Sequence, residues 1–235
     1  APMSKHDPTA HDVAVTDLPP TQPGAAAPVS IDPVALAPPG FPLLRGIRWG
    51  TDPAILLLHA PGGDLDDWRD LPPRLAHRTE SGTVALDLPG HGLSDESPDH
   101  DDDPERLVDL LKSVIATTDC TGVRAVVAAG ATATALLRVV ADVHLSGIVC
   151  LSPELPQPEA RPLPRSPRVP KLLLVRGGES DELPRARQLA AEVGGWTIVS
   201  GVTGAGPNGM PPDGPRGDQV HDQIAGFLFE CLLRR

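Results

Sequence analysis

The apolar residues of this chain fall into short runs that end in glycine or proline. A run of five apolar residues closed by turn residues, as in AILLLHAPGG at 54–63, is typical of a strand buried on both faces. Other segments share this pattern or a shorter form of it. Strands are therefore predicted within residues 43–50, 54–63, 83–92, 123–130, 146–153, 170–178 and 195–202.

Segments with helical spacing alternate with these strands. In the stretch that follows Asp103-Pro104, apolar residues recur at 107, 108, 110, 111, 114 and 115, and the Asp-Pro pair fits an N-cap and first turn. Helices are predicted on similar grounds within residues 68–78, 106–118, 131–143, 181–193 and 219–235. This alternation predicts an α/β fold with a mostly parallel central sheet and helices on both faces. Ligands of such sheets bind at the carboxyl ends of the strands.

The first part of the chain shows neither pattern. Residues 1–42 are crowded with Pro, Ala, Asp and Thr and have no sustained period. We expect a Pro/Ala-rich tail there, without regular secondary structure, which is either mobile or extended over the domain. The whole chain has 235 residues, of which 40% are hydrophobic, so it can bury one good core. A single domain over residues 43–235 is the prediction.

Composition narrows the classes of partner. The formal net charge is -11 and no cluster of Lys and Arg occurs, which argues against nucleic acid. No apolar run approaches the ~20 residues of a membrane span, and no signal peptide is recognisable, so we expect a cytoplasmic protein without a membrane partner. The three cysteines lack the spacing of a zinc site or a disulfide framework. The GxGxxG match at 204–209 leads into a loop instead of a helix, so neither a metal nor a cofactor is expected.

Five blocks, in sequence order, resemble the α/β-hydrolase family over residues 43–235. ALDLPGHGLSD at 85–95 is the most specific block and is similar to the family's fourth strand and the loop after it. LLLHAPGGDLDDW is similar to the third strand and oxyanion loop, and VVAAGATATALL to the fifth strand and nucleophile elbow. LSGIVCLSP and PKLLLVRGGESDELP resemble the sixth and seventh strands, with only a short proline-rich connection between them. The resemblance implies an α/β-hydrolase fold with a minimal or absent cap.

The resemblance also implies a catalytic triad, of which this sequence keeps little. The family needs a serine at a strained strand-to-helix turn, a histidine base and an acid that orients it. The elbow, matched as Gly130 to Thr134, places Thr132 at a vestigial nucleophile position, where a β-branched residue fits poorly. Asp181 stands at the acid position and Pro207 where the histidine is missing. The one histidine downstream, His221, lies at the edge of an apolar helix face and is interpreted as structural.

The oxyanion loop shows a similar loss. The resemblance places Ala60 and Pro61 in this loop, and proline has no backbone N–H to donate to an oxyanion. Only the amide of Ala133 is left as a donor. The loss of one such donor typically lowers the rate by a factor of about 10² to 10³.

Three further residues are candidates for a pocket. His59 and His91 should lie near the carboxyl ends of two strands, where they either form structural hydrogen bonds or act as acid or base in non-hydrolytic chemistry. Trp68, after the oxyanion loop, is the third candidate.

These losses predict a degraded catalytic site in a protein that does not hydrolyse esters. Such a protein would be a small-molecule binder, a scaffold or a regulatory pseudoenzyme, with a small-molecule ligand or a protein as its partner. Two enzymatic alternatives stay open. One is an ester or thioester hydrolase that uses Thr132 and Asp181 with an unrecognised base. The other is a cofactor-free lyase or cyclase that uses the same pocket.

Overall fold

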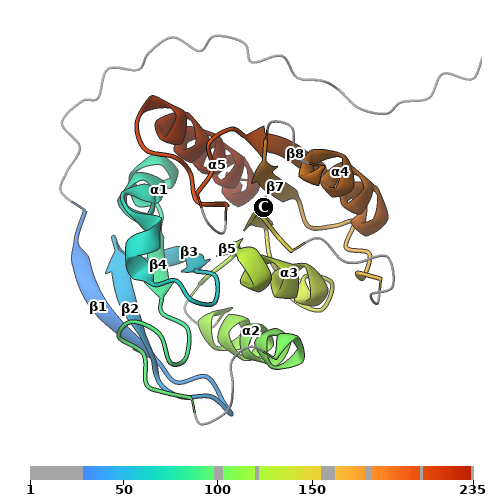
Figure 1. The fold of residues 1–235 in the computed structure, drawn as a ribbon. Helices are drawn as coiled ribbons and strands as arrows, with labels where there is room; N and C mark the ends of the chain where they lie inside the picture. The colour runs from blue at the N-terminus through green and yellow to red at the C-terminus, as the bar shows by residue number, and fades with distance from the viewer. Residues whose placement is uncertain are drawn as a thin grey trace, which may run out of the picture.

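An eight-stranded sheet forms the centre of the protein, in the order β1-β2-β4-β3-β5-β6-β7-β8 (Figure 1). The computed structural model describes residues 29–97, 103–119, 122–154, 162–177, 181–206 and 209–233. The strands are β1 (Ile31–Leu36), β2 (Leu44–Trp49), β3 (Pro53–Leu58), β4 (Gly82–Leu86), β5 (Ala125–Ala129), β6 (Gly147–Leu151), β7 (Lys171–Arg176) and β8 (Thr197–Val202). Strands β3 to β8 pair in parallel, whereas β2 pairs antiparallel with both β1 and β4. The predicted mostly parallel sheet is confirmed.

Helices cover both faces of this sheet, as the alternating pattern predicts. They are the short 3₁₀ helix η1 (Leu65–Trp68), α1 (Leu71–Thr79), α2 (Pro104–Asp119), α3 (Gly130–Val139), α4 (Glu182–Val193) and α5 (Pro215–Leu233). Strand residues alternate between two cores: Leu56 belongs to the core that includes residues of α2, α3 and α4, and its neighbour Leu57 to the core that includes residues of α1 and α5. The apolar runs are therefore buried on both faces, and this explains why they lack a polar position in every second residue.

The sheet begins inside the segment for which we expected no regular structure. Strand β1 pairs along its whole length with β2, from Ile31 opposite Trp49 to Leu36 opposite Leu44. It forms one edge of the sheet, where Pro33 is tolerated because an edge strand leaves half of its N–H groups unpaired. The expected tail is therefore corrected for residues 31–36, and residues 1–28 lie outside the part of the chain that the structure describes.

Between β6 and β7 the described residues, 152–154 and 162–170, form neither helix nor strand. Residues 155–161 of this connection, where a cap would be inserted, lie outside the described part. No helix among the described residues is long and apolar enough to cross a membrane.

Candidate functional site

The turn from β5 into α3 lies at Gly130. Ala129 is still extended, with φ -122° and ψ 151°, and the helix starts at Gly130, whose φ is 55°. A positive φ is a conformation that glycine adopts readily and other residues adopt at a cost. The strained position of the strand-to-helix turn is therefore occupied by Gly130, two residues before the expected Thr132. This position carries no side chain.

Thr132 instead lies inside the first turn of α3. Its side chain is fully buried, and its hydroxyl donates a hydrogen bond of 2.7 Å to the backbone oxygen of His59 at the end of β3. The hydroxyl thus joins α3 to the neighbouring strand and is closed off from solvent. Neither the position nor the exposure of Thr132 is that of a nucleophile at the top of the sheet.

The shift of the turn also moves the amide that would stabilise an oxyanion. In this family that amide belongs to the residue after the turn, which is Ala131. Ala133, the expected donor, is buried two residues further along α3. The sequence analysis placed the turn two residues too late because the residues around it are all small. Only one glycine was available to align the elbow with the family motif.

The loop after β3 offers no free donor at the expected place. Ala60 is buried, and its backbone oxygen accepts a 3.0 Å hydrogen bond from the N–H of Gly63, which closes a tight turn. Pro61 within this turn has no N–H. The next amide, that of Gly62, donates to Nε2 of His91 at 2.9 Å. The first two amides that could face an oxyanion are therefore missing or already bonded.

His59 is buried and both of its ring nitrogens are bonded. The N–H of Leu88 donates to Nε2 at 3.0 Å, so the ring proton lies on Nδ1, which donates to the backbone oxygen of Ala60 at 2.8 Å. Burial lowers the pKa of His59 and keeps the ring neutral. The 3.5 Å separation of Nε2 from Oδ1 of Asp87 is therefore a contact of a neutral ring with a carboxylate, since Nε2 carries no proton.

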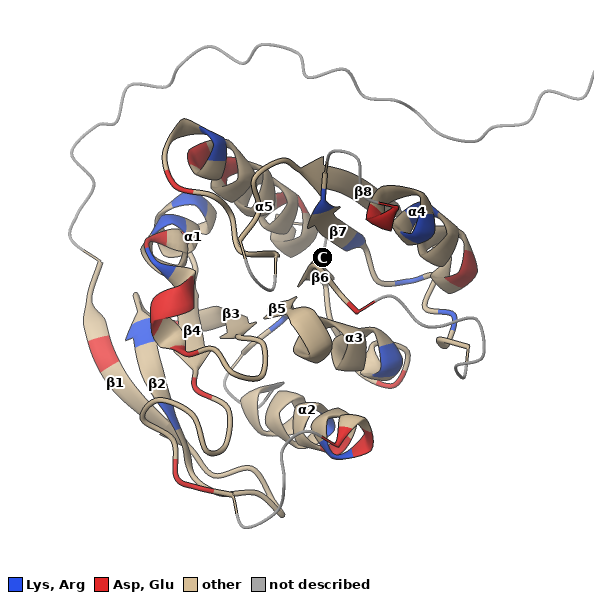
Figure 2. Cartoon of the chain, viewed as in Figure 1, with Lys and Arg blue, Asp and Glu red and all other residues tan. Residues whose placement is uncertain are grey.

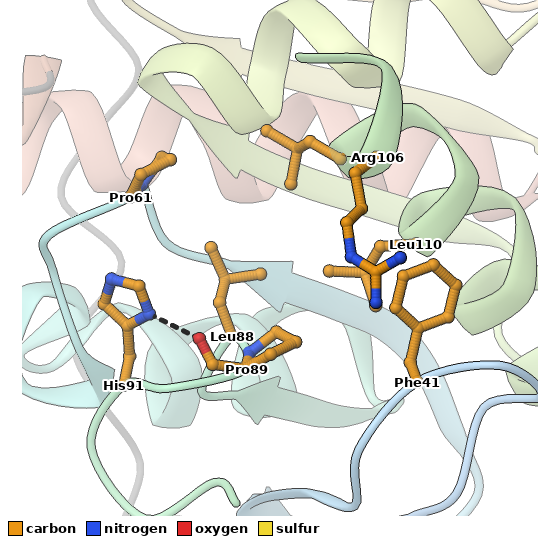
Figure 3. Close-up of a pocket in the computed structure, with 8 residues that line it drawn as sticks. Phe41, Pro61, Leu88, Pro89, His91, Arg106 and Leu110 are labelled. Atoms are coloured by element: carbon orange, nitrogen blue, oxygen red, sulfur yellow. Dashed lines mark hydrogen bonds between the residues drawn. The ribbon is translucent and has the colours of Figure 1, made fainter. Parts of the chain in front are cut away.

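His91 repeats this arrangement in the loop after β4. Its Nε2 accepts from Gly62, so its Nδ1 carries the proton and donates to the backbone oxygen of Pro89 at 2.8 Å (Figure 3). The ring centroids of His91 and His59 are 5.4 Å apart. The structure thus brings the two histidines together after β3 and β4, but each uses both ring nitrogens to hold backbone groups.

Asp87 is a central residue of the site that the sequence analysis did not single out. Its carboxylate is buried, with Oδ1 accepting from the N–H of Leu65 at 2.9 Å and Oδ2 from the N–H of Leu93 at 2.8 Å. The two acceptors fix the loop after β3 against the loop after β4. The aspartate within the matched ALDLPGHG block was the available signal.

The remaining predicted residues lie apart from this cluster. Trp68 ends η1 and is buried in the core beneath α1 and α5, where its indole N–H has no hydrogen-bond partner among the described residues. Asp181 is exposed just before α4 and makes no capping bond. Pro207 lies outside the described residues.

A small cavity adjoins the oxyanion loop (Figure 3). Its free volume is about 10 Å³, enough for about one water molecule. Pro61 and His91 border it on one side and α2 on the other, and Trp68 is not part of its wall. The lining residues are Phe41, Pro61, Leu88, Pro89, His91, Arg106, Leu107 and Leu110.

The neutral state of His59 predicts a pH dependence of stability. Its pKa is lowered in the folded chain, so the unfolded chain takes up the proton first as the pH falls below about 6.5. We expect the free energy of unfolding to decrease below that pH and His59→Gln, which keeps an acceptor for the Leu88 amide, to weaken this decrease. Urea unfolding at pH values above and below 6.5 measures it. An equally steep pH dependence in the variant would contradict the assignment.

Comparison with known proteins agrees with this architecture. A model of the alpha/beta hydrolase family matches residues 55–225. The fold is similar to that of a predicted CIB-like hydrolase from Thermoplasma acidophilum, with a TM-score of 0.68 and 14% identity over 86% of this chain and 99% of that chain. It is also similar to esterase LipW from Mycobacterium marinum (TM-score 0.61, 14% identity, 87% of this chain and 82% of that chain). The esterase domain of a Rhodothermus marinus protein has a TM-score of 0.64 at 10% identity, with 86% of this chain and 98% of that chain covered.

None of the curated proteins matches the chain significantly in sequence. The low identities of the solved structures mean that they establish the fold alone. The family match covers most of the domain, from β3 into α5, and the strand order is that of one continuous sheet with both faces covered. The chain belongs to the α/β-hydrolase family.

Proposed function

We propose that this chain is a non-hydrolytic member of the α/β-hydrolase family that acts by binding a protein partner. The observation that carries this proposal is Gly130 at the turn from β5 into α3, with φ 55°. Nucleophilic catalysis in this family needs an activated side chain at that turn. A glycine supplies none, and the nearby Thr132 hydroxyl is buried and bonded to the backbone of His59.

The state of the other polar groups supports the same proposal. The Gly62 amide is already bonded, Pro61 has none, and the ring nitrogens of His59 and His91 all hold backbone groups. A general base must reach the proton it abstracts, and an oxyanion donor must be open to the substrate. These contacts also disfavour the lyase or cyclase alternative, which needs one of the two histidines as acid or base.

A protein partner is favoured over a small ligand by the size of the cavity. Pockets for drug-sized ligands have volumes of about 300–1,000 Å³, whereas the cavity beside Pro61 and His91 holds about one water molecule. Beside Pro61 and His91 the described surface is filled rather than hollow, which fits a binding module better than a substrate pocket.

Ester turnover tests the proposal against its main competitor. An ester hydrolase is the function that the names of the similar solved structures favour. We expect hydrolysis of p-nitrophenyl butyrate by the purified chain to equal that of buffer with a non-enzymatic protein. Thr132→Val, which removes only the hydroxyl, should give the same rate. Turnover above this background that is lost in Thr132→Val would favour the hydrolase and restore Thr132 as its nucleophile.

A ligand screen separates the protein partner from a small-molecule ligand. A ligand that binds only the folded state raises the unfolding temperature. If the chain binds no such ligand, short-chain and medium-chain esters and carboxylic acids should leave this temperature unchanged. A rise that saturates with ligand concentration would replace the scaffold proposal with that of a small-molecule binder.

A further inference from the structure

Three potential metal ligands meet where α1 and α5 begin. Asp70 immediately precedes α1, and Asp218 and His221 lie one turn apart in the first part of α5. One ligand atom from each residue lies within 4.8 Å of the other two. Figure 2 shows charged residues of both signs on these two helices, which pack side by side on one face of the sheet.

His221 provides the observation that points to a ligand. Its side chain is only 8% exposed, and Nδ1 has no hydrogen-bond partner among the described residues. This nitrogen lies 3.3 Å from Oδ1 of Asp70 without the geometry of a hydrogen bond, and the ligand atoms of His221 and Asp218 lie within 4.8 Å of each other. A buried polar atom without a hydrogen bond in a folded protein calls for an explanation, and an ion is one of the usual ones.

Arg74 pairs with both carboxylates and neutralises one of their two charges. It donates from Nε to Oδ2 of Asp70 at 2.6 Å, and its Nη2 contacts Oδ1 of Asp218. Oδ1 of Asp70 is left facing His221. The neighbouring pair of Arg69 and Asp213 adds one charge of each sign. Three carboxylates and two guanidinium groups leave one net negative charge, which favours a cation.

Two of the three ligand atoms already have the spacing of a tetrahedral ion. Bonds of about 2.0–2.2 Å place the ligand atoms of a tetrahedral zinc site roughly 3.3–3.5 Å apart. The separation of 3.3 Å between His221 and Asp70 already meets this requirement. The side chain of Asp218 is 53% exposed and has room to move toward the other two. One imidazole nitrogen with two carboxylate oxygens suits Zn²⁺, whereas Mg²⁺ and Ca²⁺ prefer oxygen ligands alone.

We propose that Asp70, Asp218 and His221 bind one Zn²⁺ ion that bridges the beginnings of α1 and α5, with Arg74 holding the two carboxylates in place. The fourth position of the ion is open to water. Sequence spacing did not reveal this site because Asp70 is remote along the chain from the two residues of α5. The ion would tie the loop after β3, which leads into α1, to the segment that leads into α5.

Zinc titration of the untagged, chelator-treated chain tests this proposal. We expect isothermal titration calorimetry to give one ion per chain. His221→Gln and Asp218→Asn should each weaken zinc binding by at least about ten-fold. Mutating a residue that only supports a metal ligand already weakens binding by about that much, and these two residues would be ligands themselves. Asp222→Asn is the matched control, since this carboxylate lies beside His221 in sequence but contacts Arg78, and its affinity should equal that of the wild type.

The unfolding temperature provides a second readout. Zinc should raise it in the wild type and in Asp222→Asn but not in Asp218→Asn, because a ligand of the folded state stabilises it. Asp218 is exposed, so its variant decides the question even if His221→Gln fails to fold. The absence of zinc binding in the wild type would overturn the proposal. An unchanged zinc affinity in Asp218→Asn would also overturn it.

Discussion

Asp87→Ala is expected to lower the free energy of unfolding by about 3–6 kcal/mol, because a hydrogen bond to a charged group contributes about 1.5–3 kcal/mol and this carboxylate accepts two. The part-buried amides of Leu65 and Leu93 would both lose the acceptor that the buried carboxylate provides. The packing around the carboxylate is tight, since a Cβ added at Gly92 would lie 2.2 Å from Oδ2 of Asp87. Urea unfolding measures the loss.

Asp95→Ala is the matched control for this variant. Asp95 is 52% exposed and pairs with Arg45 at 3.2 Å, and exposed pairs contribute about 0–1 kcal/mol. Equal losses in the two variants would contradict the view that Asp87 fixes the loops after β3 and β4. A large loss in Asp87→Ala alone supports it.

Trp68→Ala is expected to destabilise the fold by about 3–5 kcal/mol, the range for truncating a large buried aromatic side chain. The indole is 2% exposed and packs in the core with α1 and α5. Trp68→Phe should lose clearly less, because the ring that replaces the indole keeps most of the packing and the lost N–H has no hydrogen-bond partner among the described residues.

Urea midpoints of the two Trp68 variants decide between a core residue and a pocket residue. A residue that lines a binding pocket can be truncated with little loss of stability. If Trp68→Ala unfolded at the urea midpoint of the wild type, Trp68 would return to the pocket where the sequence analysis placed it.

The strands and helices of the domain were predictable from the sequence because their physical signals are strong. Apolar runs closed by glycine or proline mark β3, β5, β6 and β7, and apolar residues at helical spacing mark α2. β1 was not predicted because it is a short edge strand with Pro33 in its middle. Its pairing with β2, which its own residues do not signal, makes it a strand.

The site was less predictable, since its important features are backbone contacts. The turn was assigned to Thr132 instead of Gly130 because a row of small residues fixes no register, and only the positive φ distinguishes one position. The sequence placed His59 and His91 near the carboxyl ends of two strands, but it could not reveal that backbone amides occupy Nε2 of both rings. Such bonds depend on loop conformation, which the pattern of side chains does not specify.

The central claim is that no nucleophile stands at the turn from β5 into α3, and covalent labelling tests it most directly. The purified chain and, in a parallel sample, an active serine esterase are incubated with a fluorophosphonate probe. The mass of each protein is then measured by intact-mass spectrometry. We expect the mass of the esterase to increase by that of one bound probe and the mass of this chain to stay unchanged, because Gly130 has no side chain and the Thr132 hydroxyl is buried. A stoichiometric adduct on the folded chain, mapped by peptide sequencing to Thr132, would contradict the account.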